Sequence, residues 1–240
     1  MLIKSVKTVS GAALLLLSMH ASALQLSETV NANLTVNLLS DYRSNGVSQT
    51  KGDPAIQGEL VVIHDSGLLG GLWMSSVDFG TKTRREEGGY VGIYKEPIED
   101  LRLTATIGQY MYPKNSSYKL TEFYGVVEYK NFRYNLVYDY NMEAPNAKFQ
   151  YFGFTFDLPY DTKLYLEYGI HDVGNVLYSS SGKVSDDYQT KKLSLKKSLL
   201  GVDWSVSYID TSITDTQCTY YVGYADSCQG TVVFGASKTF

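Results

Sequence analysis

The feature that most constrains the fold is a repeated alternation of apolar and polar residues, in segments of about ten residues. A period of two indicates a β-strand with one apolar and one polar face. Ten residues is also about the length that a tilted strand needs to cross the hydrocarbon layer of a membrane. The pattern predicts twelve strands, near residues 34–42, 55–64, 72–79, 89–95, 101–112, 120–130, 132–141, 149–158, 162–171, 189–197, 202–210 and 231–240.

The two faces separate most clearly in residues 162–171. One face carries Leu164, Leu166, Tyr168 and Ile170, and the other carries Lys163, Tyr165, Glu167 and His171. The third segment is less regular. We assign Trp73, Val77 and Phe79 to its apolar face, although Ser75 shares that face.

The connections alternate between short and long along the whole chain. Short links follow the even-numbered strands, at 64–71, 96–100, 130–131, 159–161 and 198–201. Long polar loops follow the odd-numbered strands, at 43–54, 80–88, 113–119, 142–148, 172–188 and 211–230. Short turns at one end and long loops at the other are typical of bacterial outer-membrane barrels.

The fold class that follows is all-β, a transmembrane antiparallel up-and-down β-barrel of about 12 strands. After the N-terminal region, no apolar run reaches the roughly 20 residues that a membrane-spanning helix needs. Strands satisfy their backbone hydrogen bonds in lipid only when the sheet closes. The irregular third and fourth strands leave ten or fourteen strands open, and alternation alone also fits a soluble sandwich.

The N-terminus has the pattern of a signal peptide. Lys4 and Lys7 precede a short apolar run at 12–17, and Ala21-Ser22-Ala23 is a cleavage pattern of small residues. We therefore expect two regions, a signal peptide at 1–23 and a barrel at 24–240. Loss of the two lysines lowers the net charge from −4 to −6, which excludes a polybasic nucleic-acid binder.

Cys218 and Cys228 are the only cysteines, and both fall in the last long loop. Thiols oxidise in an exported chain, so we predict a structural disulfide between them. Closing a loop of about ten residues stabilises it by roughly 2–3 kcal/mol. Two cysteines with no nearby histidine do not make a metal site, and the sequence predicts no cofactor.

Two histidines are candidates for a chemical role. His64 with Ser66 resembles part of a hydrolase pair, but these residues fall at a short link, and beyond the adjacent Asp65 no partner acid or amide is evident. We therefore favour a turn there and predict no enzymatic activity. His171 lies at the outer end of the ninth strand, where it is either a pH-sensitive group at the pore mouth or an ordinary polar rim residue.

The stretch from 41 to 76 has a denser pattern of its own. It contains Asp41-Tyr42-Arg43, Gly46, Ser48-Gln49-Thr50, Pro54-Ala55, Gln57-Gly58, His64-Asp65-Ser66-Gly67, Gly71 and Trp73. This pattern resembles the TorF family of porins, bacterial outer-membrane proteins long catalogued as conserved hypothetical. The resemblance implies a channel. The chain departs from the family at Asn45, where arginine is usual, and at Leu69, where an aromatic residue is usual.

The last strand ends on an aromatic residue, Phe240. In this it resembles outer-membrane barrels, whose terminal Phe is presented to the assembly machinery. Lys238 stands where an apolar residue is common, and we expect its ammonium to reach the lipid headgroups. Outer-membrane lipid and lipopolysaccharide, in a Gram-negative bacterium, are then the expected surroundings.

The polar faces predict a lumen with charges of both signs. The pore-lining candidates are Arg43, Glu59, Arg102, Glu122, Glu128, Arg133, Asp139, Lys163, Glu167, Lys192, Lys196 and Asp203, with Asp41 and Lys130 also inward or at the rim. Buried charges of this kind indicate a narrow aqueous path or a plugging network of salt bridges. In the favoured interpretation, Lys163, Lys192 and Lys196 face Glu122, Glu128 and Asp139 across the lumen.

The predicted function is therefore a porin-like channel for passive diffusion of small hydrophilic solutes or ions. The alternative left open is a non-conducting structural or adhesive barrel whose long loops bind a partner.

Overall fold

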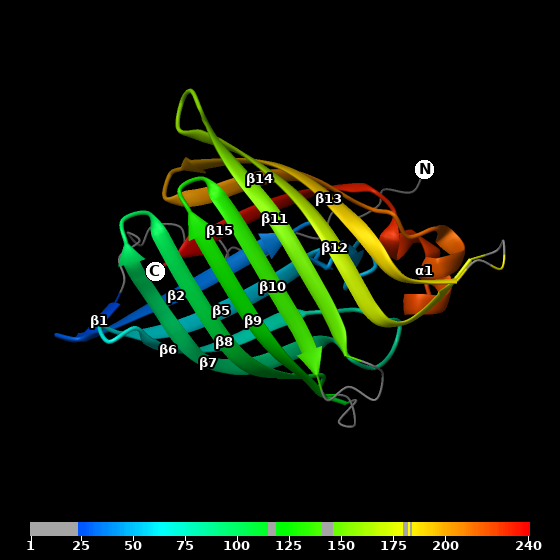
Figure 1. The fold of residues 1–240 in the computed structure, drawn as a ribbon, viewed down its shortest axis with the longest axis horizontal. Helices are drawn as coiled ribbons and strands as arrows, with labels where there is room; N and C mark the ends of the chain where they lie inside the picture. Colours follow the sequence, from blue (N-terminus) through cyan, green and yellow to red (C-terminus); the bar gives the residue numbers. More distant parts are fainter. Residues whose placement is uncertain (1–23, 115–118, 141–145, 180–181, 183) are drawn as a thin grey trace, which may run out of the picture.

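The computed structural model describes residues 24–114, 119–140, 146–179, 182 and 184–240, and the predicted signal peptide lies outside them. Within this part of the chain, twelve long antiparallel strands form one closed barrel (Figure 1). They are β2 (Val30–Leu39), β5 (Ala55–His64), β6 (Leu68–Ser76), β7 (Arg85–Ile98), β8 (Leu101–Met111), β9 (Lys119–Tyr129), β10 (Phe132–Tyr140), β11 (Ala147–Leu158), β12 (Thr162–Tyr178), β13 (Val184–Leu199), β14 (Val202–Thr211) and β15 (Thr231–Thr239).

Each of these strands pairs with the next one in the sequence, and β15 pairs with β2 to close the ring. The last residue belongs to this closure, because the backbone N–H of Phe240 donates to the carbonyl of Leu34 at 2.8 Å. The short β1 (Leu24–Ser27) pairs with the first residues of β2, from Val30 to Ala32, just beyond the end of β15. Closure leaves no long edge strand among the described residues, and a barrel in lipid needs such closure.

The twelve predicted strands are confirmed, and their bounds differ mainly at the ends. The strand predicted at 162–171 extends to Tyr178, and the strand predicted at 189–197 already begins at Val184. The alternation fades in these added residues, whereas the pairing of the two strands continues past a register shift. The first strand ends at Leu39 instead of 42. Asp41 leaves the sheet because its carboxylate accepts hydrogen bonds from Ser48 and Thr50 in the following loop.

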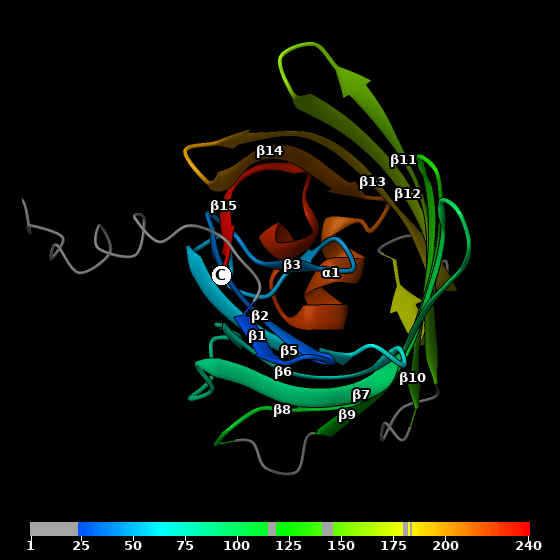
Figure 2. The same ribbon diagram turned by 90° about the vertical axis from the view of Figure 1, so that its left-hand side faces the viewer.

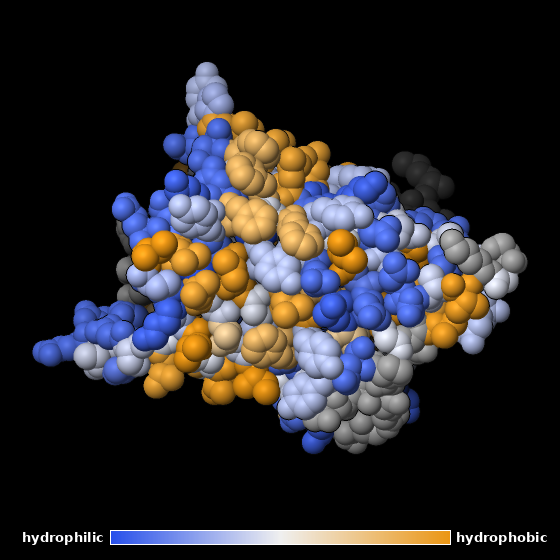
Figure 3. All heavy atoms as spheres, in the orientation of Figure 1, coloured by the Kyte–Doolittle hydropathy of each residue, from blue (hydrophilic) through white to orange (hydrophobic). Residues whose placement is uncertain are grey.

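The outer face of the barrel is apolar. In β12, Leu166, Tyr168 and Ile170 are each about 40% exposed, whereas His171 on the inner face is fully buried. Figure 3 shows hydrophobic residues gathered over the middle of the strands, with hydrophilic residues mostly toward the two ends. This is the distribution expected of a surface that contacts acyl chains at its middle and water at its ends.

The assignment of faces in the third strand was wrong. Leu72 and Met74 are exposed on the outer face of β6, whereas Trp73 and Ser75 point inward. Val77 is buried and Phe79 lines the interior, both in the loop after the strand. The misassignment arose because we placed the large Trp73 ring on the outside, whereas inside it packs against Tyr42 and Tyr110, with ring centroids 6.0 and 5.9 Å away.

The barrel has a short-turn end and a long-loop end. Tight turns link the strands at the short-turn end, where Lys130, Tyr160, Asp161 and Leu200 all have positive φ. At the long-loop end lie a hairpin of β3 (Arg43–Ser44) and β4 (Val47–Ser48), and two short helices, α1 (Asp215–Val222) and η2 (Ala225–Cys228). Neither helix has the length and hydropathy needed to cross a bilayer.

Candidate functional site

The first long loop folds into the barrel. Seen along the barrel, β3 and α1 project within the ring of strands (Figure 2). Asn45 and Gly46 form the tip of the β3–β4 hairpin with φ values of 51° and 82°, the left-handed pair that a two-residue hairpin turn requires. A Cβ on Gly46 would lie 2.7 Å from the Cγ2 atoms of Thr190 and Thr211, so only glycine fits against the wall there.

Two tyrosines of the wall bind the hairpin tip. The Tyr188 hydroxyl donates to the Asn45 backbone carbonyl at 2.8 Å, and the Tyr151 hydroxyl donates to the Asn45 side-chain oxygen. The tip is therefore held against β11 and β13. Asn45, one of the two positions where the chain departs from the TorF pattern, therefore contacts the inner wall.

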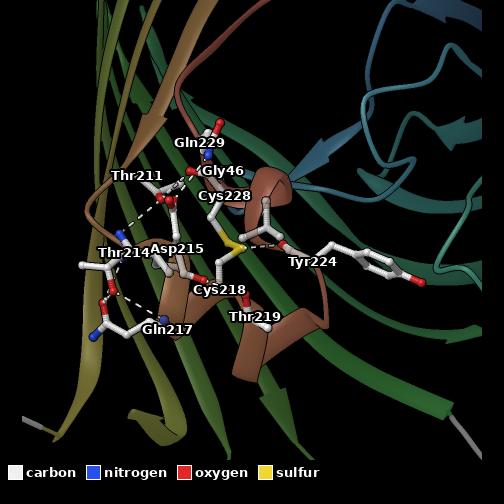
Figure 4. The surroundings of a disulfide bond; sticks show 12 residues. Gly46, Thr211, Thr214, Asp215, Gln217, Cys218, Thr219, Tyr224, Cys228 and Gln229 are labelled. Atoms are coloured by element: carbon white, nitrogen blue, oxygen red, sulfur yellow. Dashed lines mark hydrogen bonds between the residues drawn. A yellow bond between two sulfur atoms is a disulfide. The ribbon is translucent and has the colours of Figure 1, made fainter. Parts of the chain in front are cut away.

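The last long loop also packs onto the interior, through α1 and η2 (Figure 4). Thr214 and Gln217 form a capping box at the start of α1, and Gly223 ends the helix with a φ of 88°. Cys218 and Cys228 form the predicted disulfide, which joins α1 to η2. The Thr211 hydroxyl donates to the Cys228 carbonyl at 2.9 Å and ties this loop to the end of β14.

Arg43 joins the two inward segments. Its Nη1 donates to the Gly46 carbonyl at 3.0 Å and to the Gln229 carbonyl at 2.8 Å. Its Nε forms a 2.7 Å ion pair with Asp41, and both side chains are about 95% buried. A charge buried this deeply is tolerated because it is both paired and hydrogen-bonded. Arg43 is therefore a structural link as well as a lining residue.

An apolar cluster supports both segments. It unites Val47 of the hairpin and Ile213, Cys218 and Cys228 of the last loop with residues of the wall. The wall contributes Val137, Ala147, Phe149, Val173, Leu177 and Tyr188. Burying a side chain such as Val47 or Ile213 contributes about 1.5–3 kcal/mol. The sequence prediction did not anticipate this packing, which narrows the barrel at its long-loop end.

A large cavity remains along the wall formed by β5 to β14, with a volume of about 960 Å³. It extends from Tyr112 and Tyr221 at the long-loop end to Leu69 and Thr104, near the short-turn ends of β6 and β8. Its acidic side chains are Glu59, Glu86, Glu122, Asp139 and Glu167, and its cationic side chains are Arg43 and Lys192. We call it the acidic cavity.

Tyrosine is the most frequent residue in the lining of the acidic cavity. The tyrosines are Tyr42, Tyr90, Tyr110, Tyr112, Tyr124, Tyr151, Tyr188 and Tyr221. Several donate to the acids, as Tyr90 does to Glu59 at 2.5 Å and Tyr112 does to Glu86 at 2.9 Å. Burial, and then the charge of Glu86, raise the pKa of Tyr42 well above its ordinary value, so this hydroxyl stays protonated. For the rings that lie in strands, the alternation with outward-facing neighbours is the sequence signal that could have placed them inside.

A second cavity of about 500 Å³ lies against β12 to β15. Lys163, Lys192, Lys196, Lys197 and Arg43 line it together with Asp41, Asp161 and Asp203, so we call it the basic cavity. Lys163 is the cross-strand partner of Lys196, and Lys192 is the cross-strand partner of Glu167. Both cavities are lined by Arg43, Lys192 and Ile209, so they meet at these residues.

Nine of the twelve pore-lining candidates border one or both cavities. They are Arg43, Glu59, Glu122, Asp139, Lys163, Glu167, Lys192, Lys196 and Asp203. The other three, Arg102, Glu128 and Arg133, form an ion-pair cluster near the short-turn end, in which Glu128 lies 2.7 Å from Arg133 and 3.6 Å from Arg102. Glu128 is thus paired with two arginines and lines neither cavity, unlike Glu122 and Asp139. Lys130, in the turn after β9, lies over the Tyr129 ring.

The two histidines lie in very different surroundings. His64 Nδ1 is 2.8 Å from Ser66 Oγ in the exposed β5–β6 turn, and among the described residues no carboxylate hydrogen-bonds to its ring. His171 was wrongly placed at the rim, because it is fully buried among the rings of Phe149, Tyr151 and Tyr188. Its Nε2 is 2.8 Å from the Thr190 hydroxyl. The described residues contain no group of three or more His, Cys, Asp or Glu side chains that could hold a metal ion.

Two residues that the sequence singled out for other reasons can also be located. Leu69, the other departure from the TorF pattern, lines the acidic cavity. The Lys238 ammonium lies 5.3 Å from the centroid of the Phe240 ring, so it makes a cation–π contact with the terminal residue.

Comparisons with known proteins agree with this architecture. The family described as "Bacterial protein of unknown function (Gcw_chp)" matches residues 23–240. No curated protein sequence matches the chain. The barrel is similar to the solved structure of the KdgM porin, with 8% identity and a TM-score of 0.54 over 87% of this chain and 99% of that one. It is also similar to the NanC porin, with 10% identity and a TM-score of 0.53 over 86% of this chain and 98% of that one. At these identities the likeness is one of fold.

Proposed function

This chain belongs to the bacterial Gcw_chp family, and we propose that it is an outer-membrane channel for the passive diffusion of small hydrophilic solutes or ions. The observation that carries the proposal is the acidic cavity, which follows the inner wall from the long-loop end toward the short-turn end. Its polar and charged lining suits water and hydrated solutes. The similarity of the fold to the KdgM and NanC porins supports the same function.

The placement in the membrane is part of the proposal. The apolar outer face would contact lipid and lipopolysaccharide, the long-loop end would face the exterior, and Phe240 would be presented to the assembly machinery. The TorF resemblance belongs here too, since both it and the barrel fold indicate a porin. The proposed role is that of a channel and not of an enzyme.

The channel we propose is narrowed but not filled. The β3–β4 hairpin and the α1–η2 loop pack against β10 to β14, and the acidic cavity stays open between these segments and the rest of the wall. An adhesive barrel would extend the long loops after the first, ninth and eleventh strands outward, and the inward folding of the first and last of these favours a channel over adhesion. Because acids outnumber cations in the larger cavity, we expect cations to pass more readily than anions.

Conductance across a planar bilayer tests this proposal. We expect discrete current steps in KCl, with a reversal potential under a salt gradient that favours K⁺ over Cl⁻. Heat-unfolded protein at the same concentration is the control for lipid defects. A folded protein that produces no discrete steps would refute the channel.

A further inference from the structure

The acids of the acidic cavity differ in how they are neutralised. Three of them accept a hydrogen bond from a tyrosine: Glu59 from Tyr90, Glu86 from Tyr112, and Glu167 from Tyr165 at 2.7 Å. Within the described part of the chain, Glu122 and Asp139 have no such donor, and neither is in an ion pair with a lysine or arginine. These two carboxyl groups are therefore the part of the lining whose charge the protein does not balance.

Glu122 and Asp139 are direct cross-strand partners on β9 and β10. The residues on either side of them in the same row are small, Gly108 on β8 and Ala147 on β11. Directly opposed residues have Cβ atoms about 4.5–5.5 Å apart, and like charges at that spacing repel. The strand register thus places the two acids side by side, and the next cross-strand partner of each is a small residue.

Asp139 is only 5% exposed, it lines the cavity, and its Oδ1 has no hydrogen-bond partner among the described residues. Two directly opposed carboxylates in such a buried place repel each other, which favours a proton on one of them. A pair that shares one proton retains a single negative charge. Burying a carboxylate oxygen without a partner costs free energy, unless a cation or a hydrogen-bond donor binds to it.

Aromatic rings lie beside this pair. Tyr124 lies two residues from Glu122 on the same face of β9, and Tyr110 lies two residues from Gly108, the cross-strand partner of Glu122 on β8. Both rings line the acidic cavity. Carboxylates together with aromatic faces are the groups that bind an ammonium ion, through charge-assisted hydrogen bonds and cation–π contacts.

We propose that Glu122 and Asp139 form a binding site for the protonated amino group of a small amine-bearing solute. The single charge of the pair matches one ammonium group, whose N–H donors can satisfy Asp139 Oδ1, the oxygen that the described residues leave without a partner. This inference rests on the proposed function, because it names the class of solute that the channel would bind in transit.

A titration that follows Trp73 tests the site. Trp73 lines the same cavity and packs against Tyr110, and Trp204→Phe leaves it as the only tryptophan. We expect ethanolamine, protonated at pH 7, to change Trp73 emission saturably in the folded protein, at an ionic strength held constant with KCl. Ethylene glycol, its uncharged counterpart, should have no effect at the same concentration.

The double variant Glu122→Gln, Asp139→Asn removes the charge of the pair and keeps its shape, so it should weaken ethanolamine binding by about tenfold or more. Glu99→Gln removes one negative charge in the exposed turn between β7 and β8 and should leave binding unchanged. Equal responses to ethanolamine and ethylene glycol, or unaltered binding in the double variant, would overturn the site. Discrete K⁺ currents without saturable ethanolamine binding would refute only this site, and binding without currents would refute only the channel.

Discussion

The Arg43 guanidinium donates a 2.8 Å hydrogen bond to the carbonyl of Gln229, a residue 186 positions later in the chain. This bond connects the β3–β4 hairpin to the loop that contains α1 and η2. The same guanidinium is paired with the buried carboxylate of Asp41. Arg43 therefore connects the two segments that narrow the barrel at its long-loop end.

Arg43→Gln should loosen both segments together. It removes one partner of a buried ion pair and leaves the Asp41 charge uncompensated, which costs about 3–5 kcal/mol. We expect faster amide hydrogen exchange in residues 43–48 and also in residues 212–229, while the strands keep their protection. Unchanged exchange in residues 212–229 would show that Arg43 does not connect the two segments.

Arg85→Gln is the matched control. Arg85 forms an ion pair of the same 2.7 Å length with Glu87, but its side chain is 55% exposed. An exposed pair contributes roughly 0–1 kcal/mol. Hydrogen exchange in the two inward segments should therefore stay as in the unmodified protein.

The sequence predicted the barrel well because a period of two is repeated in most of the strands. The polarity of residues such as Leu166, Glu167 and Tyr168 indicates which face of the strand each lies on, because a strand in a barrel has only an inner and an outer face. The same logic placed most of the charged lining residues. It failed at Trp73, where we weighted the hydrophobicity of one ring above the alternation of Leu72 and Met74 around it.

The inward loops show what a strand pattern leaves out. Two local signals were present, the Asn45-Gly46 turn and the Thr214-x-x-Gln217 capping box, and both could have predicted the hairpin and the helix. Neither could show that these elements fold into the barrel. That placement depends on contacts between residues far apart in the sequence, such as Tyr188 with Asn45, and on the apolar cluster around Cys218.

Removing the disulfide should weaken the α1–η2 loop locally. In the Cys218→Ser, Cys228→Ser double variant the loop loses about 2–3 kcal/mol, the value expected for a closed loop of about ten residues. Chymotrypsin should then cleave faster at Tyr220, Tyr221 and Tyr224, because cleavage requires the loop to open. The turn residue Tyr160, which is 86% exposed, provides an internal control and should be cleaved at the same rate in both proteins. Equal cleavage of the loop in both proteins would contradict a stabilising role for the disulfide.

The central claim is that the apolar outer face meets acyl chains while the inward side chains line a lumen, and the two tryptophans report these two sides separately. Trp204 is 51% exposed on the outer face of β14, and Trp73 lines the acidic cavity. The measurement is the quenching of each tryptophan by lipids with brominated acyl chains, in the single-tryptophan variants Trp73→Phe and Trp204→Phe. We predict strong quenching of Trp204 and weak quenching of Trp73. Equal quenching of the two, or a Trp204 that the brominated lipid does not reach, would contradict the claim.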